Sequence, residues 1–171
     1  ILRGSEKYPI KRITSIKAKR ELEKYDLLVR ICGDSPFYPF LIVKKSIDTF
    51  KINPHNLFAI TNIRKRNFPR GMSIEIYNNH ELNSLLNTNP NLNKIEHMSE
   101  LISNHKPNNL KVFDIKTNKN LLEILPNKLT LDTYYDYELF SYLIANNFDN
   151  YCNQIIRTIK LIWLFLFIWN Y

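Results

Sequence analysis

The chain has 171 residues, which suffices for one hydrophobic core with appendages and is short for two domains. Its 24 lysine and arginine residues exceed its 16 aspartate and glutamate residues, and the formal net charge of +8 favours a polyanionic partner such as a nucleic acid. Three glycines exclude a glycine-rich phosphate-binding loop, and two widely separated cysteines indicate neither a zinc site nor a redox motif, so no metal and no cofactor is predicted.

The N-terminal segment is the most basic part of the chain. Residues 1–12 lack an apolar period, which predicts an extended arm, whereas residues 14–25 open with capping side chains and continue with good helix formers. Lysine and arginine here suit phosphate contacts, because they neutralise charge and release counterions. An ordinary solvated terminus is the alternative. The phosphate-binding candidates of this segment are Arg3, Lys7, Lys11, Arg12, Lys17, Lys19 and Arg20.

Residues 27–46 predict a β-hairpin. Two runs rich in aliphatic and aromatic residues, 28–31 and 40–43, suit strands, and the Gly-Asp-Ser-Pro sequence between them is typical of a turn. Residues 57–63 predict a third strand and residues 73–77 a further short one.

A basic loop follows the third predicted strand. Residues 64–70 contain four cations and one phenylalanine, a composition that can hold phosphates while an aromatic ring stacks on a base, as in RNA binding. A plain exposed basic loop is the alternative. The RNA-binding candidates here and in the hairpin are Arg30, Lys44, Lys45, Arg64, Lys65, Arg66, Phe68 and Arg70.

The second half of the chain is read as a helical insertion followed by the rest of the core. Residues 80–109 contain leucine and isoleucine at helical spacing, and their histidines lack the spacing of metal ligands. Strand character returns at 110–115. Residues 134–160 predict helix, interrupted at Asn146 and Asn147, because asparagine tolerates the left-handed backbone that ends a helix.

Nine uninterrupted apolar residues, 161–169, form a tail. A bilayer span needs about twenty residues, so the tail is too short to cross a membrane. It is expected to dock on a partner protein, with an interfacial position or the protein's own core as alternatives. The partner-binding candidates are Trp163, Phe165, Phe167 and Trp169.

The order of these elements resembles the bacterial-type small-subunit ribosomal protein S-sixteen family. Pro36-Phe37-Tyr38, between the two hairpin runs, is similar to that family's Arg-Pro-Phe-Tyr core. Residues 129–132, with Leu139, Tyr142 and Leu143, resemble its late strand and following helix. The chain is thus identified as a divergent, enlarged organellar member. The resemblance implies a structural, non-enzymatic protein of a mitochondrial or other organellar ribosome, whose partners are ribosomal RNA and neighbouring ribosomal proteins.

The predicted fold class is α+β: a small mixed or antiparallel sheet with helices packed at its ends, a helical insertion and an apolar C-terminal tail. The segments are an arm and short helix at 1–25, core parts at 26–79 and 110–160, the insertion at 80–109 and the tail at 161–171. The alternative function is a membrane-associated accessory subunit of an organellar respiratory complex, anchored by the tail. An enzyme is the third possibility, for which only a cluster of Asp132, Asp136 and Glu138 stands out. Acidic residues in a first helical turn suit the helix dipole, so this cluster predicts no catalytic site.

Overall fold

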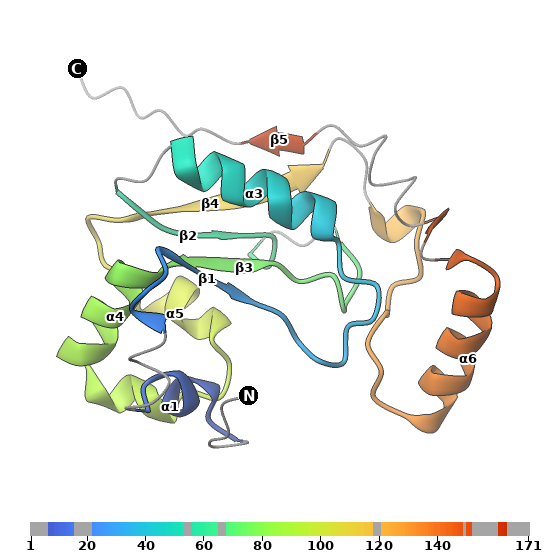
Figure 1. Ribbon diagram of the computed structural model, residues 1–171, viewed down its shortest axis with the longest axis horizontal. Coiled ribbons are helices and arrows are strands. Elements are labelled where there is room, and N and C mark those ends of the chain that lie inside the picture. Colours follow the sequence, from blue (N-terminus) through green and yellow to red (C-terminus); the bar gives the residue numbers. More distant parts are fainter. Residues whose placement is uncertain are drawn as a thin grey trace.

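The computed structural model describes residues 7–15, 22–52, 56–64, 68–117, 121–148, 150–151 and 161–163. It has three layers, with α3 on one face of a mixed sheet and α4 and α5 on the other, which confirms the predicted α+β class (Figure 1). The strands are β1 Leu27–Arg30, β2 Leu57–Thr61, β3 Glu75–Asn78, β4 Lys111–Thr117 and β5 Leu161–Trp163. The helices are α1 Pro9–Ile13, α3 Phe40–Ile52, α4 Asn79–Thr88, α5 Ser99–Asn104 and α6 Tyr134–Ala145, with short 3-10 turns η1 Pro90–Lys94 and η2 Leu121–Glu123.

The strands lie in the order β1-β3-β2-β4-β5. β3 runs antiparallel to both of its neighbours, whereas β2 and β4 are parallel. β1, β2 and β4 therefore point the same way, and their carboxyl ends meet at one edge of the sheet, where β3 begins. The register places Glu75 opposite both Arg30 and Thr61, and Thr61 opposite Asp114.

β2 is buried along its whole length because the sheet is covered on both faces. Ile60 belongs to the core cluster on the α3 side, and Phe58 to the cluster under α4 and α5. A strand covered on both faces reads as a continuous apolar run rather than an alternating one. The predicted strand at 57–63 is confirmed on these grounds over Leu57–Thr61.

The predicted second hairpin strand at 40–43 is wrong, because this segment begins α3. Ile42, Val43, Ser46 and Phe50 are the buried positions of α3, and they recur at the three-to-four residue spacing of one helix face. The amides of Ile42 and Val43 both donate to the Pro39 carbonyl at 3.0 and 3.1 Å, which closes the first turn. An apolar run of four residues fits a strand and a helix equally well, and the helical spacing of the buried Ser46 and Phe50 after it identifies the segment as a helix.

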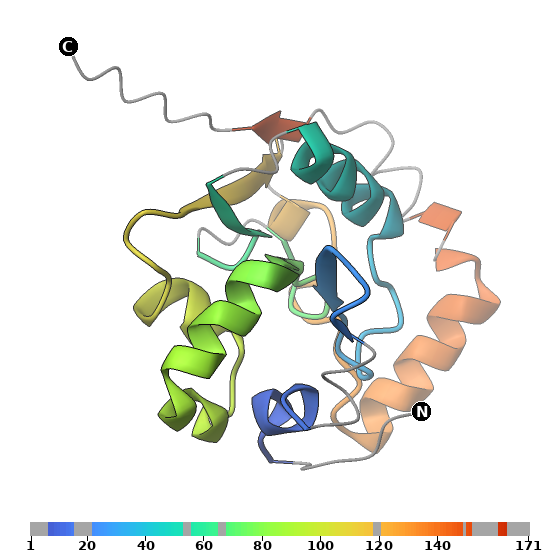
Figure 2. The same ribbon diagram turned by 60° about the vertical axis from the view of Figure 1, so that its left-hand side comes forward.

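The helices predicted within residues 80–109 are present as α4 and α5. They cover the face of the sheet opposite α3, and Figure 2 shows α1 beside them. The prediction of an extended arm is wrong for Pro9–Ile13, which forms α1 with Ile10 fully buried in this second cluster. Thr14 ties α1 to η1 through a 3.1 Å hydrogen bond to Asn93. The predicted helix over 14–25 lies largely outside the described residues.

α6 lies at the end of the molecule where η2 approaches the sheet (Figure 1). It ends before Asn147, whose φ of 57° confirms the predicted interruption. Phe140 faces the core and meets the ring of Phe37 edge-on at 5.3 Å. Leu139 and Tyr142, which were compared with residues of the family's late helix, are 48% and 66% exposed.

Two further predictions concern strands. Residues 129–132 do not form the expected strand; among the described residues their segment contributes only an isolated bridge between Arg70 and Lys128. The first three residues of the apolar tail are β5, which pairs antiparallel with β4. The rest of the tail lies outside the described residues.

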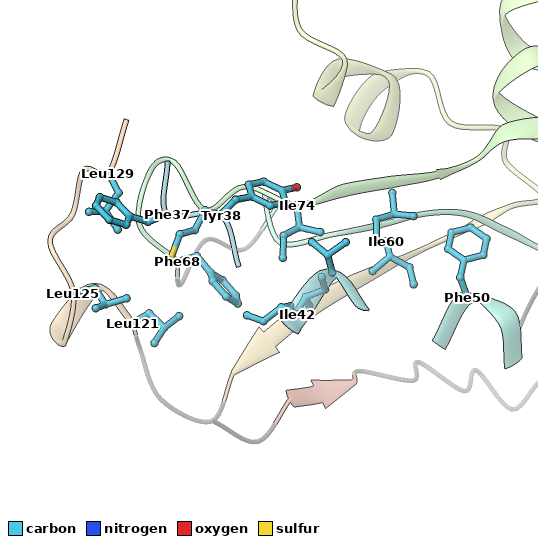
Figure 3. Close-up of a cluster of buried hydrophobic side chains, with 14 of the residues drawn as sticks. Phe37, Tyr38, Ile42, Phe50, Ile60, Phe68, Ile74, Leu121, Leu125 and Leu129 are labelled. Carbon is cyan, nitrogen blue, oxygen red and sulfur yellow. The ribbon is translucent and has the colours of Figure 1, made fainter. Parts of the chain in front are cut away.

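The larger core cluster fills the space between α3 and the sheet and continues beyond the carboxyl ends of the strands. Figure 3 shows Phe37, Phe68, Leu125 and Leu129 gathered there, away from Phe50 at the other end. This packing joins the loops after β1 and β2 to the segment after η2.

Candidate functional site at the carboxyl edge of the sheet

A cavity of about 910 Å³ opens where the carboxyl ends of β1 and β2 meet the segment after η2. We call it the carboxyl-edge cavity. In open sheets with parallel strands, ligands bind in the crevice outside the carboxyl ends of the strands. Three loops line it, through Cys32, Asp34 and Ser35, then Arg70, Gly71 and Ser73, then Asn127 and Thr130.

Backbone hydrogen bonds hold the three loops together. The amide of Arg70 donates to the carbonyl of Asn127 at 3.0 Å, and the amide of Leu129 donates back to the carbonyl of Arg70 at 2.8 Å. The amide of Leu131 donates to the carbonyl of Asp34 at 2.8 Å. The segment after η2 thus binds both other loops, and the cavity wall is built by tertiary contacts.

Gly71 permits the closest of these approaches. Its φ is +92°, a region that side-chain-bearing residues rarely adopt, and a Cβ at this position would lie 2.2 Å from the carbonyl oxygen of Leu129. The loop after β2 can therefore lie against residues 127–130 only with glycine here.

Buried polar side chains fix the loop after β2 from below. Asn62 donates to the Met72 carbonyl and accepts from the Ile74 amide, both at 2.8 Å. Its side chain thus satisfies two backbone groups that would otherwise need a neighbouring strand. Thr61 donates to the Ile74 carbonyl at 2.8 Å. Phe68 is 1% exposed and packs in the core. The loop is therefore anchored at both ends, with Arg70 left at the surface.

An ion pair joins the end of β1 to the start of β3. The Arg30 guanidinium contacts the carboxylate of Glu75, which is 2% exposed. Tyr77 donates its hydroxyl hydrogen to the other Glu75 oxygen at 2.6 Å. Burial, and then the Glu75 charge, raise the pKa of Tyr77, so its phenol stays a donor. The Tyr38 hydroxyl donates to the Arg30 carbonyl at 3.1 Å, which ties the end of β1 to the loop that follows it.

The third segment continues into the cap of α6. Asp136 accepts from the Thr133 amide at 2.8 Å and from Lys128 at 2.7 Å, while Thr133 caps the helix in return. Lys128 also lies 3.1 Å from Asp132. The Lys128 hydrogen bond lowers the pKa of both aspartates. Asp136 therefore completes the capping box of α6, as expected of a first-turn acid, whereas Asp132 precedes the helix and pairs with Lys128.

The lining offers groups of distinct chemistry. Arg70 presents an exposed guanidinium, which suits phosphate or carboxylate groups. Asp34 is half-buried, with its carboxylate accepting from the Ser35 hydroxyl at 3.1 Å. Burial raises the pKa of the Cys32 thiol, so it stays protonated at neutral pH and is a poor nucleophile. No group of three metal-ligating side chains occurs among the described residues.

The structure separates the residues that had been predicted to bind RNA. Of these, Arg70 lines the cavity, whereas Arg64 is held by Asp114 through contacts of 2.8 and 2.6 Å and Phe68 is in the core. Lys44 and Lys45 lie on the exposed side of α3, and Lys7, Lys11 and Arg12 lie at α1. The candidates outside the described residues are Arg3, Lys17, Lys19, Arg20, Lys65, Arg66, Phe165, Phe167 and Trp169, and the side chain of Trp163 is also not described.

Most lining residues were missed by reasoning from the sequence. The Gly-Asp-Ser turn after an apolar strand could have indicated Asp34, because polar residues at the carboxyl end of a strand are candidates for a site. Gly71, directly after Pro69 and Arg70, could have indicated a constrained turn. Asn127 and Thr130 carry no signal of their own in the sequence.

Comparisons with known proteins give one informative result. No protein-family model matches the chain, and no curated protein matches it. The chain is similar to the solved structure of a cytidylyltransferase from Leptospira borgpetersenii serovar Hardjo-bovis (strain JB197), with 27% sequence identity and a TM-score of 0.66. The match covers 84% of this chain and 58% of that one, so the chain spans little more than half the length of this neighbour.

This similarity corrects several predictions. Membership of the ribosomal S-sixteen family is wrong, because the structural neighbour belongs to a different class of protein. A structural role in the ribosome, the absence of enzymatic activity and partnership with ribosomal RNA and ribosomal proteins are contradicted by the same finding. The alternative of a membrane-associated respiratory subunit gains no support either. Within the described part of the chain, no helix is both long and apolar enough to cross a bilayer.

Proposed function

We propose that the chain takes part in nucleotidyl transfer and that the carboxyl-edge cavity binds the phosphate end of a nucleoside triphosphate. The observation that carries this proposal is the meeting of Arg70 and Asp34, from two loops, in one cavity at the carboxyl edge of the sheet. The similarity to a cytidylyltransferase supports the reaction class and makes CTP the first nucleotide to test.

In nucleotidyl transfer an oxygen of the acceptor attacks the α-phosphorus, and the bond from this phosphorus to the bridging oxygen of the β-phosphate breaks. Pyrophosphate leaves with the electron pair of that bond, and the acceptor loses its proton to solvent or to a nearby base. The protein contributes mainly by positioning the phosphates and by stabilising their charge. An exposed guanidinium that binds two phosphate oxygens serves both purposes, and Arg70 fits this role.

Asp34 fits a second role. Mg²⁺ prefers oxygen ligands, and in phosphate-transfer sites one or two protein carboxylates hold it while phosphate oxygens and waters complete its shell. Among the described residues that line the cavity, Asp34 is the carboxylate. It would hold one position of an ion that arrives with the nucleotide and neutralises phosphate charge. The backbone carbonyl of Asp34 accepts a hydrogen bond from the Leu131 amide, which keeps Asp34 in place.

The polar groups around this pair suit the rest of a nucleotide. Ser35, Ser73 and Thr130 offer hydroxyl groups, and Asn127 offers an amide that both donates and accepts. Such groups hydrogen-bond ribose hydroxyls and base edges, so the cavity has room and partners for more than the phosphates.

The predicted organellar location remains a prediction.

Titration of CTP with Mg²⁺ into the protein, followed by calorimetry, tests the assignment. Arg70→Ala should weaken binding about 10-fold to 100-fold, because a hydrogen-bonded charged group contributes about 1.5–3 kcal/mol. Arg64→Ala is the matched control, since it removes the same charge from a position already held by Asp114. Equal losses in the two variants, or no binding by the unmodified protein, would overturn the assignment.

A further inference from the structure

The ion pair between Arg30 and Glu75 lies next to residues that line the carboxyl-edge cavity. The lining residue Cys32 comes two positions after Arg30 at the end of β1. The lining residue Ser73 comes two positions before Glu75, which is opposite Arg30 in the sheet. Burial raises the pKa of the Cys32 thiol and the Arg30 charge opposes this rise, so the thiol and the guanidinium are close. The Arg30 side chain thus borders the cavity wall at Cys32.

The Arg30 guanidinium is held by one carboxylate and keeps other donors. Its Nη1 donates to Glu75, which is 2% exposed and whose other oxygen accepts from Tyr77 at 2.6 Å. A guanidinium has five N–H groups. Within the described part of the chain, Glu75 is the one acceptor that this guanidinium has, and 26% of the Arg30 side chain is exposed. Several N–H groups of Arg30 are therefore available to a ligand.

A guanidinium held in this way suits an oxyanion. Its planar set of donors matches the geometry of phosphate and carboxylate groups. Glu75 is buried and is itself fixed by Tyr77, so it restricts the movement of Arg30. A side chain that is already ordered loses less entropy when a ligand binds.

We propose that Arg30, positioned by Glu75, binds a second oxyanion of the substrates in the carboxyl-edge cavity. The first oxyanion is the phosphate assigned to Arg70. The second is a further phosphate of the nucleotide or an acidic group of the acceptor, which present the same chemistry to a guanidinium. This inference rests on the proposed function, because nucleotidyl transfer brings several oxyanions into one cavity, and it adds a binding residue from β1.

Inorganic pyrophosphate is the probe, titrated into the full chain and followed by calorimetry. Arg30→Gln combined with Glu75→Gln removes both charges together, which a fold tolerates better than the loss of one partner. This double variant should bind pyrophosphate at least about tenfold more weakly than the unmodified protein. The matched control is Arg64→Gln combined with Asp114→Asn, which removes a similar ion pair from residues outside the cavity lining. It should change the affinity less than about twofold, because solvent screens distant charges.

Glu75→Gln alone separates binding from structure. It keeps Arg30 but removes the counter-charge, so the guanidinium attracts an oxyanion more strongly and the affinity for pyrophosphate should rise about threefold or more. An ion pair that served structure alone would give a loss of affinity in this variant as well. Circular dichroism establishes that each variant is folded, and the double variant decides the test if Glu75→Gln is not.

A second titration identifies the source of the oxyanion. Inorganic phosphate is titrated into the protein with and without saturating CTP. Binding that depends on Arg30 and persists with CTP bound assigns the oxyanion to the acceptor, whereas binding that CTP abolishes assigns it to the nucleotide.

Three results would overturn the proposal. The first is equal pyrophosphate affinity in the double variant and its matched control. The second is a folded Glu75→Gln variant that loses as much affinity as the double variant. The third is the absence of pyrophosphate binding by the unmodified protein. Failure of the proposed function is distinguishable, because it appears in the CTP titrations of the unmodified protein and of the Arg70 and Arg64 variants.

Discussion

The two edges of the sheet differ in how their cavities are built. At the carboxyl edge, three loops are joined by backbone hydrogen bonds, and a glycine allows their closest approach. At the other end of the parallel strands, a second cavity of about 870 Å³ is lined by Leu27 and Val29 of β1 together with Ile47 and Phe50 of α3. The first cavity is thus bounded by loops that are bonded to one another, and the second by side chains of a strand and a helix.

The difference separates two kinds of binding. A preorganised polar cavity loses little entropy when a small charged ligand enters, because its groups are already held in place. A cavity with an apolar wall instead favours ligands that bury apolar surface against it. Substitutions that disturb the hydrogen bonds between the three loops should therefore lower the stability of the folded protein as well as its affinity for a ligand.

The largest effect is expected at Gly71. Gly71→Ala forces a Cβ against the Leu129 carbonyl and strains a positive φ, so the free energy of unfolding should fall by about 3 kcal/mol or more. Gly33→Ala is the control, because a Cβ there meets no atom within 4 Å. Urea unfolding measures both. If Gly71→Ala were as stable as Gly33→Ala, the three loops would not be held as closely as described.

The next effect concerns the ion pair between Arg30 and the buried Glu75. Glu75→Gln leaves Arg30 without its counter-charge, and because Arg30 is 26% exposed and glutamine can still accept a hydrogen bond, the expected loss is about 2 kcal/mol. Asp114→Asn breaks the more exposed pair with Arg64 and should cost less than about 1 kcal/mol. Equal losses would show that burial at the start of β3 adds nothing to this pair.

The smallest effect concerns how the free energy of unfolding depends on pH in acid. The Lys128 hydrogen bond lowers the pKa of Asp136 and Asp132 from their ordinary 3.8, so their contribution is present above that pH and is lost as the pH falls toward the lower folded-state values. Lys128→Ala should therefore make the free energy of unfolding less dependent on pH below about 4. Lys94→Ala, which removes a charge from η1, is the control. Parallel pH curves for the two variants would contradict this role of Lys128.

Sequence patterns predicted the elements whose burial follows a simple period. The strand at Leu57–Thr61 and helix α4 were found because apolar residues mark them directly. α3 was misread because Phe40–Val43 alone does not distinguish a strand from a helix. The basic loop was misread because a pattern of charges does not reveal the partner of each cation. Arg64 forms an ion pair with Asp114 of β4, whereas Arg70 lines the carboxyl-edge cavity.

The candidate site was hardly predictable for a physical reason. Its residues come from three loops that are distant in sequence, and tertiary hydrogen bonds between Arg70, Asn127 and Leu129 bring them together. The positive φ of Gly71 depends on that meeting and is invisible in the sequence. The family resemblance, which rested on Pro36-Phe37-Tyr38 and on residues 129–132 with the helix that follows, could not replace this information.

The spatial order of the strands has a consequence for how the molecule forms. Only residues 62–74 separate β2 from β3, so these two strands can pair early. Longer segments separate β1 from β2 and β3 from β4. Contacts between distant parts of a chain form slowly, because loop closure costs entropy before any contact compensates for it. The nucleotide binding proposed for the carboxyl-edge cavity should therefore reappear during refolding only in the slowest phase, when the last of the three loops is in place.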